Sequence, residues 1–208
     1  MRNGAAVAFA MACLAAASAH AQDAAPTNVA GTFAGFRLEG NIGWDKTQSL
    51  GRNNEKLGYG GSVGFDGNLT NRIVIGPEFT YWRPNHGQNS NAAPGVAGGT
   101  VVHEGREMLS GDIRIGYRVD SDLLVFGKGG YVSQSQRSYF YAPVGQVGYS
   151  THGHPDGYQF GGGLQYAPHD RFSFAPANMY VSAQYVYSKF DNGTKDQHAM
   201  AGIGIRLR

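Results

Sequence analysis

Eight segments of this chain alternate apolar and polar side chains with a period of two residues, and this alternation constrains the fold more than any other feature. A period of two places successive side chains on opposite faces of a β-strand. In the first segment, Phe36 and Leu38 share one face and Arg37 lies on the other. We therefore expect an all-β chain. The predicted strands cover residues 35–45, 56–66, 73–82, 108–118, 123–133, 158–166, 179–190 and 197–207.

The length and number of these segments indicate how the strands are assembled. About ten residues suffice for a tilted strand to cross a bilayer, and eight is the smallest even number of strands in such barrels. Beyond the first 21 residues, no run approaches the roughly 18 consecutive apolar residues of a membrane helix. A chain of this kind spans a membrane with strands. The pattern predicts an eight-stranded antiparallel up-and-down transmembrane β-barrel.

The connections between the predicted strands fall into two classes. Tight turns are expected at Thr70-Asn71 and at Asp120-Ser121-Asp122, whereas the connections over 47–54, 83–105 and 134–157 are long. Short turns on one side and long loops on the other are typical of the periplasmic and external ends of a membrane barrel. The connection over 167–178 departs from this scheme, because it is long and falls on the periplasmic side.

Alternation also fits a soluble sandwich or a lipocalin-type barrel, so a second feature has to separate these alternatives. The aromatic residues on the apolar face gather near the two ends of the predicted strands. Two belts of amphipathic rings are typical of the two interfaces of a membrane. The predicted inner belt consists of Phe36, Phe65, Tyr117 and Tyr166, and the outer belt of Trp44, Tyr59, Tyr81, Tyr131, Tyr158 and Tyr187.

The N-terminus has the three parts of a secretory signal peptide. Met1-Arg2 is a short basic start, residues 5–17 are apolar, and Ala19-His20-Ala21 is a small-x-small cleavage site. A lipoprotein signal with Cys13 as the acylated residue is the weaker alternative, because Ala10 stands where leucine is usual. We expect residues 1–21 to be the signal peptide, 22–32 a flexible leader and 33–208 the outer-membrane barrel.

Composition removes several classes of function. Cys13 is the only cysteine, so the mature chain has neither a disulfide nor a thiol ligand. Removal of the signal takes Arg2 from the 17 basic residues, which leaves the mature chain almost neutral against 15 acidic residues. A near-neutral surface gives no electrostatic reason to bind nucleic acid. The face opposite the apolar one is rich in glycine and serine, as a narrow barrel interior requires.

Charged residues on that second face are the candidate site. Buried charges have to be paired, so they predict a closed, salt-bridged lumen. The alternative is a water-filled lumen in which the charges form no fixed network. The predicted lumen network consists of Arg37, Glu39, Glu78, Asp112, Arg114 and Lys128.

One loop contains residues that could carry chemistry. His152, His154 and Asp156 alternate as a metal site could require, but histidines in polar loops are usually solvated and no further ligand is evident. Ser150 and His152 invite comparison with outer-membrane lipid hydrolases, yet no acid is placed to orient the histidine. We therefore predict no catalytic, cofactor-binding or metal site.

Three stretches resemble the late strands of the OmpA/opacity-type, porin-like outer-membrane β-barrel proteins: GKGGYV at 127–132, GGGLQYAPHDRFSF at 161–174 and QYVYSKFDNG at 184–193. The resemblance implies a lipid-embedded barrel at the cell surface with a structural, adhesion or host-contact role. Two positions differ from the family pattern. Gln184 stands where an acidic residue is usual, and Arg206-Leu207-Arg208 stands where a terminal aromatic residue is read by the barrel assembly machinery.

Three functions remain open on the sequence. The first is a non-catalytic surface barrel of the cell outer membrane, in contact with outer-membrane lipid and lipopolysaccharide, whose long loops bind a host or envelope ligand. The second is a small passive diffusion channel. The third is a lipid A-modifying hydrolase that uses the region of His152.

Overall fold

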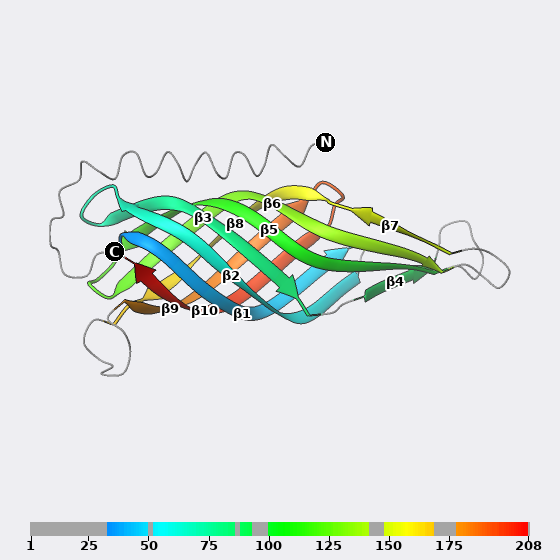
Figure 1. The fold of residues 1–208 in the computed structure, drawn as a ribbon, viewed down its shortest axis with the longest axis horizontal. Coiled ribbons are helices and arrows are strands. Elements are labelled where there is room, and N and C mark those ends of the chain that lie inside the picture. Colours follow the sequence, from blue (N-terminus) through cyan, green and yellow to red (C-terminus); the bar gives the residue numbers. More distant parts are fainter. Residues whose placement is uncertain are drawn as a thin grey trace.

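The computed structural model describes residues 33–49, 52–85, 88–92, 100–141, 148–168 and 178–207, and the predicted signal peptide and leader lie outside these residues. The described chain is all-β and forms a closed barrel (Figure 1). None of the described residues belongs to a helix with the length and apolarity of a membrane span. The strands are β1 (Gly35–Ser49), β2 (Arg52–Asn68), β3 (Ile73–Pro84), β4 (Gln88–Ala92), β5 (Thr100–Arg118), β6 (Leu123–Tyr141), β7 (Tyr149–Gly153), β8 (Asp156–Tyr166), β9 (Met179–Phe190) and β10 (Lys195–Leu207).

Eight of these strands close the barrel, and each pairs antiparallel with its neighbours. The order around the barrel is β1, β2, β3, β5, β6, β8, β9 and β10, and the closing pair of β1 with β10 runs from Phe36↔Leu207 to Gln48↔Lys195. This confirms the predicted eight-stranded up-and-down barrel.

The two ends of the barrel differ. One end carries Phe33, Leu207 and the tight turns over 69–72 and 119–122, and we call it the terminal end. Both predicted tight turns are present, and in the first the Thr70 hydroxyl accepts hydrogen bonds from the backbone N–H of Arg72 at 3.2 Å and of Ile73 at 3.0 Å. At the opposite end, which we call the projecting end, the longest strands, β5 and β6, extend past the others.

The predicted long connections at the projecting end are wrong in extent. β1 ends only at Ser49 and β2 already begins at Arg52, so only two residues of the connection predicted over 47–54 lie outside the strands. β5 already begins at Thr100 and β6 ends only at Tyr141. The short strands β4 and β7 pair with the free edges of β5 and β6 there (Figure 1). Strands pair through backbone hydrogen bonds whatever surrounds their two faces. A period of two appears in the sequence only where the two faces of a strand lie in different environments, so it does not reveal these extensions. Of the predicted connection over 167–178, residues 169–177 lie outside the described residues.

Side-chain exposure follows the predicted alternation along the barrel strands. In β9 and β10, every second residue is buried and the residues between are mostly exposed. The outer face carries apolar side chains such as Ile42, Ile113 and Ile203, each more than half exposed. The inward-facing side chains include 22 buried polar or charged residues among those described. The barrel is therefore apolar outside and largely polar inside.

Candidate functional site

A buried carboxylate near the terminal end gathers three guanidinium groups. Asp66 is fully buried, and its Oδ2 lies 2.7 Å from Arg37 Nε, 3.0 Å from Arg114 Nη1 and 3.2 Å from Arg206 Nη1. The four residues come from β2, β1, β5 and β10, so their contacts tie together strands from different parts of the barrel. Charge-assisted contacts of this kind are about twice as strong as neutral hydrogen bonds.

A second carboxylate extends this cluster toward β3 and β6. Glu78 Oε2 accepts a hydrogen bond from Arg37 Nη1 at 3.0 Å, and its Oε1 lies 2.7 Å from Lys128 Nζ. Arg37 therefore bridges Asp66 and Glu78. We refer to the connected residues as the charged layer: Arg37, Asp66, Glu78, Arg114, Lys128 and Arg206.

Of the six residues predicted from the sequence, four lie in the charged layer. The other two point into the lumen but accept hydrogen bonds from neutral groups. Glu39 accepts a hydrogen bond from the Ser182 hydroxyl at 2.9 Å, and Asp112 accepts one from the Gln159 side-chain amide at 2.7 Å.

Asp66 and Arg206 belong to the charged layer but are absent from the predicted set. The alternation already assigns both to the inner face, because Asp66 follows the outward Phe65 and Arg206 lies between the outward Ile205 and Leu207. Each lies close to a strand end, where a charge is easily taken for part of a solvated turn. Applying the same alternation up to the strand ends finds them.

Apolar groups cover the charged layer on the side of the terminal end. Phe33, Val74 and Leu124 form a small buried cluster there. The Phe33 ring lies 5.6 Å from the Arg206 guanidinium, and the Phe126 ring lies 3.8 Å from that of Arg114. Aromatic rings over desolvated guanidinium groups are favourable cation–π arrangements.

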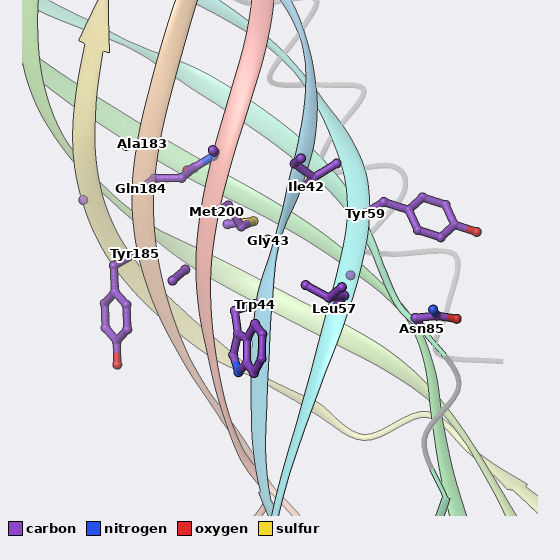
Figure 2. A pocket seen from close by; sticks show the side chains of 14 residues that line it. Ile42, Gly43, Trp44, Leu57, Tyr59, Asn85, Ala183, Gln184, Tyr185 and Met200 are labelled. Atoms are coloured by element: carbon purple, nitrogen blue, oxygen red, sulfur yellow. The ribbon is translucent and has the colours of Figure 1, made fainter.

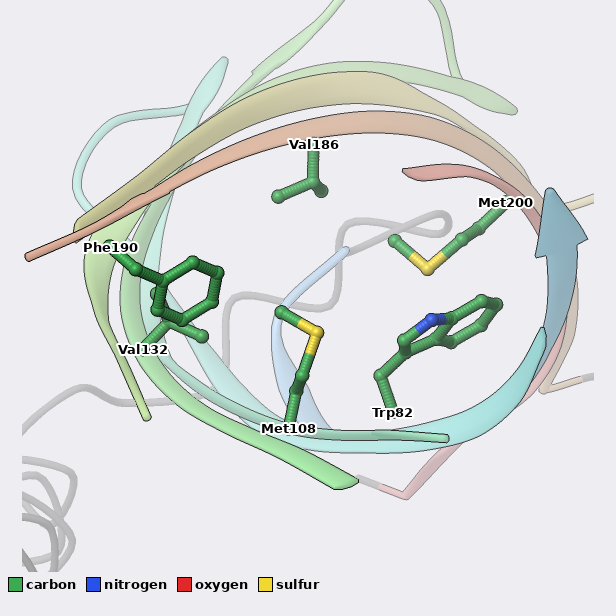
Figure 3. Packing of buried hydrophobic residues seen from close by; sticks show 6 residues of the cluster. All are labelled: Trp82, Met108, Val132, Val186, Phe190 and Met200. Atoms are coloured by element: carbon green, nitrogen blue, oxygen red, sulfur yellow. The ribbon is translucent and has the colours of Figure 1, made fainter. Parts of the chain in front are cut away.

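On the other side of the charged layer lies a larger apolar cluster, which we call the apolar layer. Its side chains converge on the barrel axis (Figure 3). Beside it, a cavity of about 20 Å³ is lined partly by Lys128, Met108 and His198. A space of that size holds about one water molecule. The apolar layer consists of Trp82, Met108, Val132, Val186, Phe190 and Met200.

Glycines on the barrel wall make room for these large inward side chains. A Cβ built at Gly58 would collide with the ring of Trp82, and one at Gly64 would lie 2.7 Å from Arg37 Nη2. Both glycines belong to β2, which therefore provides space for one residue of each layer.

Polar residues lie beyond the apolar layer toward the projecting end. Trp82 Nε1 donates to Asp45 Oδ2 at 3.1 Å, and His198 Nδ1 lies 3.4 Å from the same oxygen. Asp196 accepts a hydrogen bond from Gln134 Nε2 at 3.1 Å. All these groups are buried, so the lumen wall is lined with polar contacts at this level.

The histidine region lies on the projecting end. Ser150 and His152 belong to β7 and are exposed, and His152 Nε2 accepts a hydrogen bond from Arg137 Nε at 2.7 Å. In the described part of the chain, no hydrogen bond joins Ser150 to His152, and no three acidic, histidine or cysteine side chains are grouped as metal ligands.

The ten predicted belt residues lie on the outer face. Six are at least 38% exposed, namely Phe36, Trp44, Tyr59, Tyr117, Tyr131 and Tyr158. Phe65, Tyr81, Tyr166 and Tyr187 are partly exposed. Phe36 pairs with Phe65 near the terminal end, and Tyr131 pairs with Tyr158 near the projecting end. Tyr185 and Phe160 share this face but are absent from the predicted belts.

Two solved barrels resemble this structure. Ail, the attachment invasion locus protein of Yersinia pestis, solved in complex with the heparin analogue sucrose octasulfate, is 19% identical with a TM-score of 0.52, covering 83% of this chain and 99% of Ail. Neisserial surface protein A is 12% identical with a TM-score of 0.51, covering 83% of this chain and 97% of its own. These similarities concern the fold.

Comparison with curated protein sequences finds no match. The family model described as outer membrane protein beta-barrel domain matches residues 9–208. Together with the closed eight-stranded barrel and its apolar outer face, this match places the protein in the cell outer membrane. The chain belongs to the outer membrane protein β-barrel family.

Proposed function

We propose that the protein is a non-catalytic surface barrel with a closed lumen, whose projecting end faces outward and binds a ligand. The observation that carries this proposal is the length of β5 and β6, each of which has 19 residues, against 11 in β8. A membrane crossing needs about 9–11 residues. About eight residues of each strand therefore continue beyond the membrane, which corresponds to roughly 27 Å at about 3.4 Å per residue.

This extension is a four-stranded sheet with an ordered surface. β4 and β7 pair with the outer parts of β5 and β6. On β6, Arg137 donates to the Tyr139 hydroxyl at 3.0 Å, and the rings of Tyr139 and Tyr141 stack with centroids 6.4 Å apart. Arg137 also donates to His152 on β7. Aromatic and arginine side chains held in place on a rigid sheet are typical of recognition surfaces.

The chemistry of this surface favours an anionic, ring-shaped ligand. The arginine supplies charge and hydrogen-bond donors, and the half-buried Tyr139 and the exposed Tyr141 supply flat faces. Ail, which has the same fold, was solved with a sulfated sugar. We therefore choose a sulfated glycan as the probe.

The filling of the lumen supports closure over a diffusion channel. The charged layer and the apolar layer follow each other along the axis, and the cavity between them measures about 20 Å³. An eight-stranded barrel conducts only where such packing is interrupted. For a hydrolase, Ser150 and His152 lack the mutual hydrogen bond that activates a serine.

The remaining partners in this proposal are those of the membrane itself. The belts and the apolar outer face contact outer-membrane lipid and lipopolysaccharide, and the barrel assembly machinery inserts the chain. No nucleic acid is expected, because the surface carries little net charge.

The test measures binding of whole cells to immobilised heparin. The variant combines Arg137→Ala, Tyr139→Ala and Tyr141→Ala, and the control is Arg72→Ala in the turn over 69–72 at the terminal end. We expect at least tenfold weaker binding for the triple variant and unchanged binding for the control, with both barrels still migrating as folded species on unheated gels. Equal binding by the triple variant, or no binding by the unaltered protein, would contradict a sulfated glycan as ligand of this sheet.

A further inference from the structure

The outer face of the barrel carries an apolar groove of about 960 Å³ over β1, β2, β9 and β10. Large side chains form its rim, and Trp44, Tyr59 and Tyr185 are each about half exposed (Figure 2). The floor is low because the residues between them are small. The outward-facing small residues are Gly162, Ala183, Ala199 and Ala201.

Strand pairing shows how the groove arises. On β10, Ala199 lies between Trp44 of β1 and Tyr185 of β9, and Ala201 lies between Ile42 and Ala183. The groove therefore lies over the outer face of β10, with Trp44 and Tyr185 on either side of Ala199 and Ile42 beside Ala201. Toward the projecting end, the same face of β10 continues to Gln197, whose Oε1 accepts a hydrogen bond from the Tyr185 hydroxyl at 2.9 Å, and then to Lys195.

Unneutralised positive charge lies beyond that end of the groove, past Gln197. Lys195 is directly opposite Lys189 in the pairing of β10 with β9, and both are exposed. Like charges in this position destabilise a sheet. Within the described residues, neither lysine has an ion-pair partner, whereas Lys46 on β1 pairs with Glu55 at 3.5 Å. Lys195 is four residues beyond Ala199, or about 13 Å along the strand.

An apolar groove with a pair of unpaired cations beyond its end is complementary to a phosphorylated lipid. One acyl chain fits along β10, and a phosphate between the two ammonium groups removes their repulsion. This inference rests on the proposed function, in which the projecting end faces outward. With that orientation, the groove lies in the outer leaflet. We propose that the groove binds an acyl chain of the lipid A part of lipopolysaccharide, with a phosphate on Lys189 and Lys195.

The test uses the purified full-length barrel in detergent micelles and follows Trp44 fluorescence in a Trp82→Phe background, since these are the two tryptophans of the chain. Lipid A is titrated into the parent and into the variant with Lys189→Gln and Lys195→Gln. We expect saturable binding by the parent and at least tenfold weaker binding by this variant. The matched control is Arg83→Gln on the outer face of β3, with less than a twofold effect. Equal binding by the lysine variant would overturn the inference.

A second pair of variants tests the groove without changing charge. Ala199→Leu fills the floor, and Gly111→Leu places the same bulk on the open outer face of β5, where an added Cβ meets nothing within 4 Å. We expect Ala199→Leu to weaken lipid A binding at least tenfold and Gly111→Leu to leave it unchanged. Equal effects of the two variants would remove the groove from the site.

The lipid itself is tested with two further probes. Lipid A without its phosphates, and phosphatidylglycerol, should each bind at least tenfold more weakly than intact lipid A. Equal binding of phosphatidylglycerol would overturn lipid A as the specific occupant. Labelling of Ser150→Cys from outside whole cells reports the orientation of the projecting end separately. If this cysteine is labelled but the purified barrel does not bind lipid A, this inference fails and the proposed orientation stands.

Discussion

The charged layer and the apolar layer occupy neighbouring levels of one lumen, but they are held together by different means. In the charged layer, Asp66 and Glu78 hold four cations at 2.7–3.2 Å, and every group comes from a different strand. In the apolar layer, Trp82, Met108 and their neighbours fill the adjacent level of the lumen by volume. Charges require specific partners, whereas apolar side chains require only complementary shape.

This difference predicts how each layer responds to damage. A buried ion loses its compensation when its partner is removed, so the cost depends on the charge left behind. An apolar side chain that is shortened leaves a void, so the cost depends on volume.

The largest effect is expected for Asp66→Asn, because three arginines share this carboxylate. We expect the free energy of unfolding to fall by about 3–5 kcal/mol. Urea unfolding in lipid vesicles measures it. Asp191→Asn, in an exposed turn, is the control and should stay within about 0.5 kcal/mol of the parent. Equal values for the two variants would show that the charges contribute nothing specific.

The apolar layer is tested by Met108→Ala. Met108 is 3% exposed and lines the 20 Å³ cavity, so shortening it enlarges a void that already exists. We expect a loss of about 2–4 kcal/mol in the same unfolding measurement. Leu109→Ala, on the adjacent outward-facing position, is the control and should cost clearly less. A larger loss at Leu109 would mean that the inner and outer faces are assigned the wrong way round.

Lys128→Met breaks the charged layer at its edge rather than its centre. Glu78 keeps its contact with Arg37, so we expect a smaller loss of about 1.5–3 kcal/mol. In a planar bilayer, we expect no steady large conductance from the parent and, at most, a small cation-selective leak from the variant. A parent protein with a frequent, stable, large open state would refute closure of the lumen and favour the channel.

The smallest effects concern coupling between the two layers. Asp66 and Met108 share no contact among those described, so Asp66→Asn and Met108→Ala should add within about 0.5 kcal/mol. Lys128 and Met108 line the same cavity, so Lys128→Met and Met108→Ala should deviate from additivity by at least about 0.5 kcal/mol. A larger coupling energy for Asp66 with Met108 than for Lys128 with Met108 would show that this cavity is not the boundary between the two layers.

The eight barrel strands follow from the sequence because each strand passes between two different environments. Lipid on one side and a polar lumen on the other produce a contrast at every second residue. The extension of β5 and β6 beyond the barrel was not predicted, because polar sequences such as 134–138 show no such contrast. Their pairing rests on backbone hydrogen bonds, which any side chain permits.

Within the eight predicted segments, the inward or outward position of a residue was determined by the sequence alone, since alternation fixes it within a regular strand. That holds for Asp66 and Arg206 as much as for Arg37. Only the tertiary structure decided which inward charges meet, because partners such as Asp66 and Arg206 are 140 positions apart. Their contact depends on the register and closure of the barrel, and neither quantity is written in the period of a single strand.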